Sequence, residues 1–349
     1  MSNFIETFVQ PGLIDGLCYG IAAIGVSLPL RFLRTADFTA VGAIMLGGMV
    51  TIWMTNVSHY WIVGLCCGSL VAGMLGLFTA FLSLNKWLKI PLMLSGIICF
   101  TASRSLGLIA EHSEVELGPS HLWNNVGEIK LDSAHFLFQS FIWRDAIIVG
   151  AIALTICVLG GIFAKSKLGC FAFAMCASSQ FLKFRHRHSN ATTVFILFVS
   201  NFLIGLCGGL LAMENSQAYV DVPLEFISLT LGAIFAGQAV IQFIARVLKR
   251  QLPAEVPLET RAEASEFHRG FLENLQLSLS TQRDDAGRMW FILCSYVCAS
   301  VVLNCITQAV QGHRIGHVSP TCENAIIAAI IIACFLISNL NSIRVNKSK

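Results

Sequence analysis

Charged residues are scarce in this 349-residue chain. Asp, Glu, Lys and Arg make up 12% of the sequence and hydrophobic residues 55%, whereas soluble domains carry about 25% charged residues. A single soluble core could not bury so much apolar surface. The apolar residues also gather in blocks of about 18 to 24, close to the roughly 20 that a helix needs to cross hydrocarbon. The composition therefore excludes an ordinary soluble domain and predicts a membrane protein.

Motifs for nucleotide binding, metal binding and secretion are also missing. No GxxxxGK[ST] motif occurs, as expected if ATP is bound elsewhere, although transporters of other classes lack this motif too. The 13 cysteines form no CxxC pair and no Cys/His ligand set, and nearly all lie in apolar blocks, where a thiol behaves as a small hydrophobe. The N-terminus lacks the basic region and cleavage site of a signal peptide. We therefore expect no catalytic residues, no cofactor, no metal and no nucleic-acid partner.

Nine apolar segments are long enough to cross a membrane. They must be helices, because backbone groups in lipid have to be satisfied within the segment and no alternating barrel pattern is present. The first two segments are separated only by RFLRTAD, so they form either a tight hairpin or a discontinuous element of the kind found in transporters. The predicted fold is one all-α transmembrane helix bundle of eight or nine spans over residues 1–349. The segments are 12–33, 38–56, 61–84, 90–109, 145–164, 191–213, 226–245, 289–307 and 323–341.

Lysine and arginine are unevenly distributed between alternate connections. Assigning every second connection to the cytoplasm places 19 of the 23 basic residues there, whereas Lys130, Arg144 and Arg314 fall on the other side. Basic residues are retained on the cytoplasmic side of a membrane. We therefore predict an N-terminus outside and a C-terminus inside. If one of the first two segments is re-entrant, the N-terminus moves inside.

Two ionisable residues lie in or beside apolar segments. Asp37 can cap the helix that follows it, or pair with Arg31 or Arg34. Arg104 stands two-thirds along its segment, close to Thr101. A charge at that depth is costly and usually faces the bundle interior or a water-filled cavity, although a long side chain can also reach the membrane interface. Both residues are candidates for a substrate pathway.

Three stretches carry a family resemblance. Tyr19–Gly48 contains the turn Asp37-Phe38-Thr39, Leu88–Ile97 contains Pro91, Ser95 and Gly96, and Lys165–Val240 contains KSKLG followed by Gln217, Asp221 and Gly237. These stretches resemble the permeases of high-affinity branched-chain amino-acid ABC importers, and more closely those described as tryptophan/tyrosine-type or uncharacterised ABC permeases. Gln238 departs from the family, which tends to carry glutamate there.

The resemblance implies the permease subunit of a bacterial inner-membrane importer that translocates a small solute, with an amino acid the favoured class. It also implies a second permease copy, ATPase subunits in the cytoplasm and an extracytoplasmic solute-binding protein as partners, with membrane lipid around the chain. The residues expected along the substrate pathway are Asp37, Thr39, Ser95, Thr101, Arg104, Gln217 and Gln238.

Two cytoplasmic connections are expected to do more than join spans. By the resemblance, the connection 165–190 couples to the ATPase through Gly169, Ala174, Gln180, Lys183 and Arg185. The family's Arg-Ala-x-Gly-x-Asn is replaced by Phe173–Ser178 in this loop, and its basic residues could simply be positive charge near anionic headgroups. The connection 248–288, which the family lacks, predicts an amphipathic helix that rests on the membrane or touches the ATPase.

Two other classes of function fit the sequence less well. A secondary transporter or channel often places several carboxylates or histidines within its spans, but Asp37 is the one acid here that is expected at depth. A membrane enzyme would need nucleophilic or metal-binding groups that converge near an interface, and no such set is evident in the sequence. An importer permease is therefore the leading hypothesis.

Overall fold

The fold was analysed in a computed structural model that describes residues 10–33, 35–85, 90–116, 142–166, 169, 172, 186–215, 226, 229–238, 240–241 and 289–312. All regular structure in these residues is helical, and five helices are long and apolar enough to cross a membrane. The prediction of an all-α, polytopic membrane fold is confirmed. The helices are α2 (Gln10–Phe32), α3 (Thr39–Ser58), α4 (Trp61–Leu84), α5 (Leu92–Glu116), α8 (Ile142–Lys165), α11 (His186–Asn215), α14 (Met289–Gly312) and the shorter Leu229–Gln238.

These helices match eight of the nine predicted segments. Their ends differ most in three places. Helix α5 runs on to Glu116, α14 runs on to Gly312, and α11 already begins at His186, within the predicted coupling loop. The ninth segment, 323–341, lies outside the described residues, as do the connection 248–288 and most of 165–190.

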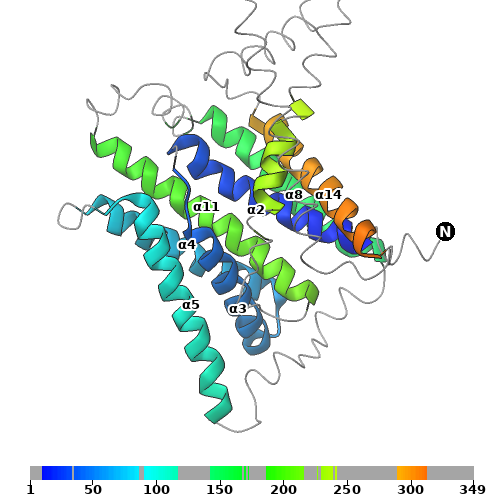
Figure 1. The fold of residues 1–349 in the computed structure, drawn as a ribbon, viewed down its shortest axis with the longest axis horizontal. Coiled ribbons are helices and arrows are strands. Elements are labelled where there is room, and N and C mark those ends of the chain that lie inside the picture. Colours follow the sequence, from blue (N-terminus) through cyan, green and yellow to red (C-terminus); the bar gives the residue numbers. More distant parts are fainter. Residues whose placement is uncertain are drawn as a thin grey trace, which may run out of the picture.

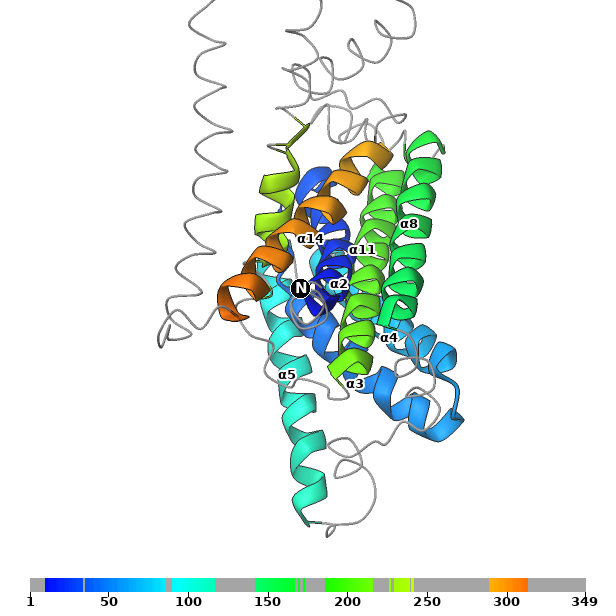
Figure 2. The same ribbon diagram turned by 90° about the vertical axis from the view of Figure 1, so that its right-hand side faces the viewer.

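Helix α11 is the centre of the bundle. It packs against α2 on one side and against α3 and α4 on the other, while α14 and α8 complete the first group and α5 completes the second. Figure 1 shows α11 crossing between these two groups, and Figure 2 shows α8 and α5 at the periphery. Helix α11 therefore joins the group of α2, α8 and α14 to the group of α3, α4 and α5.

The first two helices do not form a tight hairpin. Helix α2 packs on α14, α11 and α8, whereas α3 packs on α4, α11 and α5. Among the described residues the two are joined by a short link that passes beside α11 (Figure 1). The tight hairpin is instead made by α3 and α4, where His59 adopts a left-handed conformation with φ 58° and its N–H donates to the Thr55 carbonyl at 2.8 Å.

Glycines allow α3, α4 and α11 to approach closely. A Cβ atom on Gly47 of α3 would lie 2.4 Å from the carbonyl oxygen of Gly205 in α11, and one on Gly68 of α4 would lie 2.1 Å from Thr51 Oγ1. Because lipid supplies no hydrophobic drive between helices, such small residues stabilise a bundle through van der Waals contact and close backbone approach. The contact between α3, α4 and α11 is therefore closely packed.

The outer surfaces of α4 and α8 are largely apolar. Large side chains of both helices are exposed, and α8 is the least enclosed of the five long spans. Exposed apolar side chains on a membrane helix suit lipid tails. The exposed residues on these two helices include Ile62, Leu70, Met74, Phe78, Phe81, Ile147, Leu154, Val158, Leu159 and Ile162.

Candidate functional site

The turn before α3 is built around the carboxylate of Asp37. Its Oδ1 accepts a hydrogen bond from the backbone N–H of Thr39 at 2.9 Å and another from the Thr39 hydroxyl. The residue in the N-cap position is Phe38, so Asp37 stands one residue earlier than a standard cap but still satisfies the first free amide of the helix. Thr39 is fully buried. The predicted capping role of Asp37 is thus found in the structure, displaced by one position.

Asn201 of α11 holds the other oxygen of this carboxylate. Its Nδ2 donates to Asp37 Oδ2 at 3.1 Å and to the Leu197 carbonyl of its own helix at 3.0 Å. Counted from Asn190, Asn201 is the twelfth residue of the 25-residue apolar span Asn190–Glu214. The carboxylate of Asp37 therefore lies level with the middle of a membrane-spanning helix.

Helix α5 closes the turn from a third side. A Cβ atom on Gly96 would lie 3.1 Å from Phe38 N and 3.2 Å from Asp37 Oδ1. The preceding Ser95 is buried, and its hydroxyl donates to the Leu92 carbonyl at 2.8 Å. The stretches around Asp37 and Ser95, far apart in the sequence, therefore meet with Asn201 at one buried polar junction, which we call the α3 junction (Asp37, Thr39, Gly96, Asn201).

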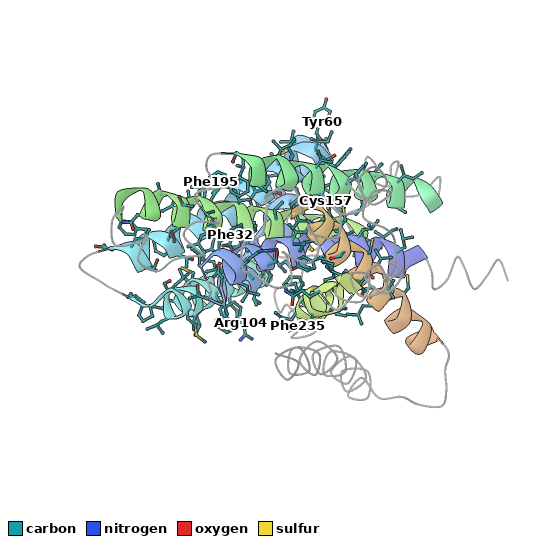
Figure 3. All side chains as sticks on the ribbon, turned by 90° about the horizontal axis from the view of Figure 1, so that it is seen from above. Phe32, Tyr60, Arg104, Cys157, Phe195 and Phe235 are labelled. Carbon is teal, nitrogen blue, oxygen red and sulfur yellow. The ribbon has the colours of Figure 1, made fainter. Side chains whose placement is uncertain are left out.

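The outward face of α5 carries the next group of predicted residues. Thr101, Arg104 and Ser105 are exposed, whereas Ser103 is buried against Gly42 of α3. The hydroxyl of Thr101 donates to the Ile97 carbonyl at 2.5 Å, and that of Ser105 to the Thr101 carbonyl at 2.9 Å. Figure 3 shows Arg104 at the outer edge of the bundle, on the side opposite Tyr60. Arg104 stands eight residues, or about 12 Å of helix, beyond Gly96.

The remaining predicted residues are not part of the α3 junction. Gln238 is exposed at the end of Leu229–Gln238, and its Nε2 lies 3.5 Å from the Tyr296 hydroxyl of α14. Gly169 is buried just after α8 and its N–H donates to Ser166 Oγ at 3.1 Å. Gln217, Ala174, Gln180, Lys183 and Arg185 lie outside the described residues.

Asn201 is the functional candidate that the sequence reading missed. It is fully buried, and no described residue donates a hydrogen bond to its Oδ1. Its signal in the sequence is a lone amide in the apolar run VFILFVSNFLIGL. Polar side chains inside membrane spans are rare enough to mark function or helix contact. The partner of such a residue, however, cannot be read from its own span.

The arrangement holds the first turn of α3 level with the middle of α11, while Arg104 lies on the exposed face of α5. Among the described residues, no set of three His, Cys, Asp or Glu side chains is placed to hold a metal ion.

Comparison with known proteins gives the family. Residues 9–248 match the family described as branched-chain amino acid transport system / permease component. No curated protein and no solved structure matches the chain significantly. The matched region spans more than half of the 349 residues and contains both the α3 junction and the outward face of α5. This chain therefore belongs to the family of branched-chain amino acid transport permeases, the membrane-spanning components of ABC transporters.

Proposed function

We propose that this chain is the permease subunit of an importer in the bacterial inner membrane and that it translocates an amino acid. Membership of a permease family supports a partnership with an ATPase and, typically, a substrate-binding protein. The amino-acid class is supported by the family description. An aromatic amino acid is the narrower proposal, because the chain resembles the tryptophan/tyrosine-type permeases.

The exposed position of Arg104 in α5 is the observation that supports a conduit along this helix. A charged side chain near the bilayer centre costs several kcal/mol when it faces lipid, so such residues usually line water-filled cavities or helix contacts. The exposed side chains of α4 and α8 are largely apolar. Helix α5 also exposes apolar side chains, such as Ile97 and Leu106, but it adds a polar group of Thr101, Arg104 and Ser105. We therefore assign α5 to the conduit and α4 and α8 to the lipid.

A second copy of the chain would complete that conduit. Helix α5 packs only on α3 and α4 among the described helices with substantial contact. Its outward face thus has no cover from the described part of the protomer. Two copies that face each other through α5 would enclose a polar passage and remove Arg104 from lipid. Arginine recognises carboxylates through two parallel hydrogen bonds, which suits the carboxylate of an amino acid.

The alternative of an ion-driven secondary transporter is less well supported. Asp37 is the acid level with the middle of α11, and its carboxylate accepts hydrogen bonds from Thr39 N, Thr39 Oγ1 and Asn201 Nδ2. Both oxygens of this carboxylate are therefore engaged, one in the first turn of α3 and the other with α11. The carboxylate serves as a structural cap better than as a proton relay.

ATPase coupling is assigned to the loop between α8 and α11. Helix α8 ends at Lys165 and α11 begins at His186, so any movement of the loop that carries Gly169, Ala174, Gln180, Lys183 and Arg185 acts on both helices. The Cβ position of Gly169 would lie 2.1 Å from the Phe163 carbonyl oxygen. A larger residue would push the loop away from α8.

The experiment is ATP-driven uptake by the chain with the ATPase that co-purifies with it. In proteoliposomes supplied with binding protein, we expect accumulation of a ¹⁴C-labelled amino-acid mixture that stops when ATP is removed. Arg104→Gln should lower uptake by about tenfold, the equivalent of one strong charged hydrogen bond, and Arg104→Lys should restore part of it. Uptake that continues without ATP but collapses with an ionophore would favour the secondary transporter.

A further inference from the structure

Helix α2 contains a proline whose missing hydrogen bond is replaced by α11. Pro29 lies inside α2 and has no N–H, so it cannot donate to the carbonyl of Gly25, four residues earlier. The hydroxyl of Ser200 in α11 donates to the Gly25 carbonyl instead, at 2.9 Å. A Cβ atom on Gly25 would lie 2.9 Å from the Ser200 carbonyl oxygen, so the two helices touch at this point.

The next residue of α11 makes the bond to the start of α3. Ser200 holds Gly25 and Asn201 holds Asp37, so consecutive residues of one helix fix both ends of the segment 25–37. This segment contains the proline and the link between α2 and α3. The segment contacts α11 at both of its ends, through Ser200 at Gly25 and through Asn201 at Asp37. A backbone weakened by Pro29 and anchored at both ends is suited to bend as a unit.

The same pair of residues lies on the helix that extends from the loop 165–190. Helix α11 begins at His186, and Ser200 is fourteen residues, or about 21 Å of helix, further along. Asp37 in turn contacts Gly96 at the start of α5, the helix that carries Arg104. A continuous chain of contacts therefore runs from the coupling loop along α11 to α2, α3 and α5.

Asn201 also keeps an unused hydrogen-bonding atom at this contact. No described residue donates to Asn201 Oδ1, and Asn201 is fully buried. A buried acceptor without a donor asks for a physical reason, such as strain or a functional role. The free oxygen leaves Asn201 able to accept a further donor if α11 moves.

We propose that Ser200 and Asn201 are positioning residues that transmit the movement of α11 to the segment 25–37 and to the first turn of α3. The pair acts as the joint between ATP hydrolysis in the cytoplasm and opening of the conduit. This proposal rests on the proposed function, since it needs an ATPase that moves the coupling loop.

The test measures solute transported per ATP hydrolysed by the reconstituted complex, with a ¹⁴C-labelled amino-acid mixture as the probe. Ser200→Ala and Asn201→Ala should keep ATP hydrolysis within about twofold of wild type and lower the transport ratio about tenfold, because each removes one buried hydrogen bond between helices. Ser200→Thr, which keeps the hydroxyl, should retain most of the ratio. The exchange Asp37→Asn with Asn201→Asp keeps a donor opposite an acceptor but loses the bond to the Leu197 carbonyl, so it should restore part of the ratio.

Two matched controls separate coupling from folding. Ser69 is fully buried and its hydroxyl donates to the Leu65 carbonyl at 2.7 Å within α4. Asn304 is buried and its amide donates to the Ser300 carbonyl at 3.2 Å within α14. Ser69→Ala and Asn304→Ala should leave the transport ratio unchanged.

The outcomes distinguish the two proposals. If the wild-type complex shows no ATP-driven uptake, both the proposed function and the proposed role of Ser200 and Asn201 are wrong. If the wild type shows ATP-driven uptake but Ser200→Ala and Asn201→Ala leave the transport ratio unchanged, only the proposed role of Ser200 and Asn201 is wrong. A parallel loss of hydrolysis and uptake that Ser200→Thr and the exchanged pair fail to rescue would reduce both residues to packing and overturn the proposal.

Discussion

Asn201 and Asp37 are 164 positions apart in the sequence, and the Asn201 amide donates a hydrogen bond to the Asp37 carboxylate at 3.1 Å. The bond joins the central helix α11 to the first residues of α3 at mid-span depth. A charged acceptor in this setting strengthens the bond, because the surrounding dielectric is low. The contact is therefore the natural place to probe both stability and transport.

Removal of the Asp37 side chain should destabilise the bundle. Asp37→Ala leaves the Thr39 N–H and the Asn201 amide without their acceptor, and we expect it to cost about 1–3 kcal/mol in the free energy of unfolding. Asp37→Asn should cost less than Asp37→Ala, because its amide oxygen still caps Thr39, although its NH2 group cannot accept the bond from Asn201. Unfolding in mixed micelles titrated with sodium dodecyl sulfate would measure both. Equal losses in the two variants would contradict the capping role.

A methyl group at the α3–α11 crossing should separate the two helices. The Cβ atom of Gly47→Ala would fall 2.4 Å from the Gly205 carbonyl oxygen, a backbone atom that cannot rotate away. Overpacking of this kind costs about 1–3 kcal/mol. Gly150→Ala in α8 is the matched control, since its Cβ would meet only Leu17 Cδ1 at 3.8 Å. Thermal unfolding in detergent should show a lower midpoint for the first variant and an unchanged one for the second.

Two threonines with the same local bonding should differ in transport. Thr101 of α5 and Thr155 of α8 are both exposed, and each hydroxyl donates to the carbonyl four residues earlier, at 2.5 and 2.8 Å. If α5 lines the conduit and α8 faces lipid, Thr101→Val should lower uptake several-fold, up to about tenfold for one lost polar contact. Thr155→Val should leave uptake unchanged. Similar effects of the two variants would refute the assignment of faces.

The orientation of the chain can be tested with two introduced cysteines. The α3–α4 turn is predicted to be outside the cell and the end of α8 inside. In a background without reactive native cysteines, His59→Cys should react with a membrane-impermeant maleimide added to intact cells, since His59 is exposed in the turn. Ser166→Cys should react only after permeabilisation. The reverse pattern would invert the topology and place the loop 165–190 away from any cytoplasmic ATPase.

The spans were predictable because the length of an apolar block is a local property of the chain. Eight helices lie where the apolar segments predict them. The relation between α2 and α3 was left open between two alternatives. A seven-residue connection permits a hairpin, and it is α11, over 150 residues later, that separates the two helices.

The α3 junction could be predicted only in part. Asp37 and Thr39 stand out from their own neighbourhood, because a carboxylate before an apolar block is a recognisable helix start. The donors from α11 cannot be recognised in this way, because the sequence around Ser200 and Asn201 does not reveal which residues they bond to. Pro29 predicts that the Gly25 carbonyl lacks a donor within its own helix. Which other helix donates a hydrogen bond to that carbonyl depends on tertiary packing.

The central position of α11 also orders the assembly of the protein during synthesis. Helices α2, α3, α4, α5 and α8 precede residue 186 and enter the membrane before α11 exists. Until it arrives, the Gly25 carbonyl and the Asp37 carboxylate lack their donors from Ser200 and Asn201. In a nascent chain arrested before residue 186, Asp37 is therefore held by Thr39 alone, and the two bonds that tie α2 and α3 to the centre of the bundle form only once α11 is in the membrane.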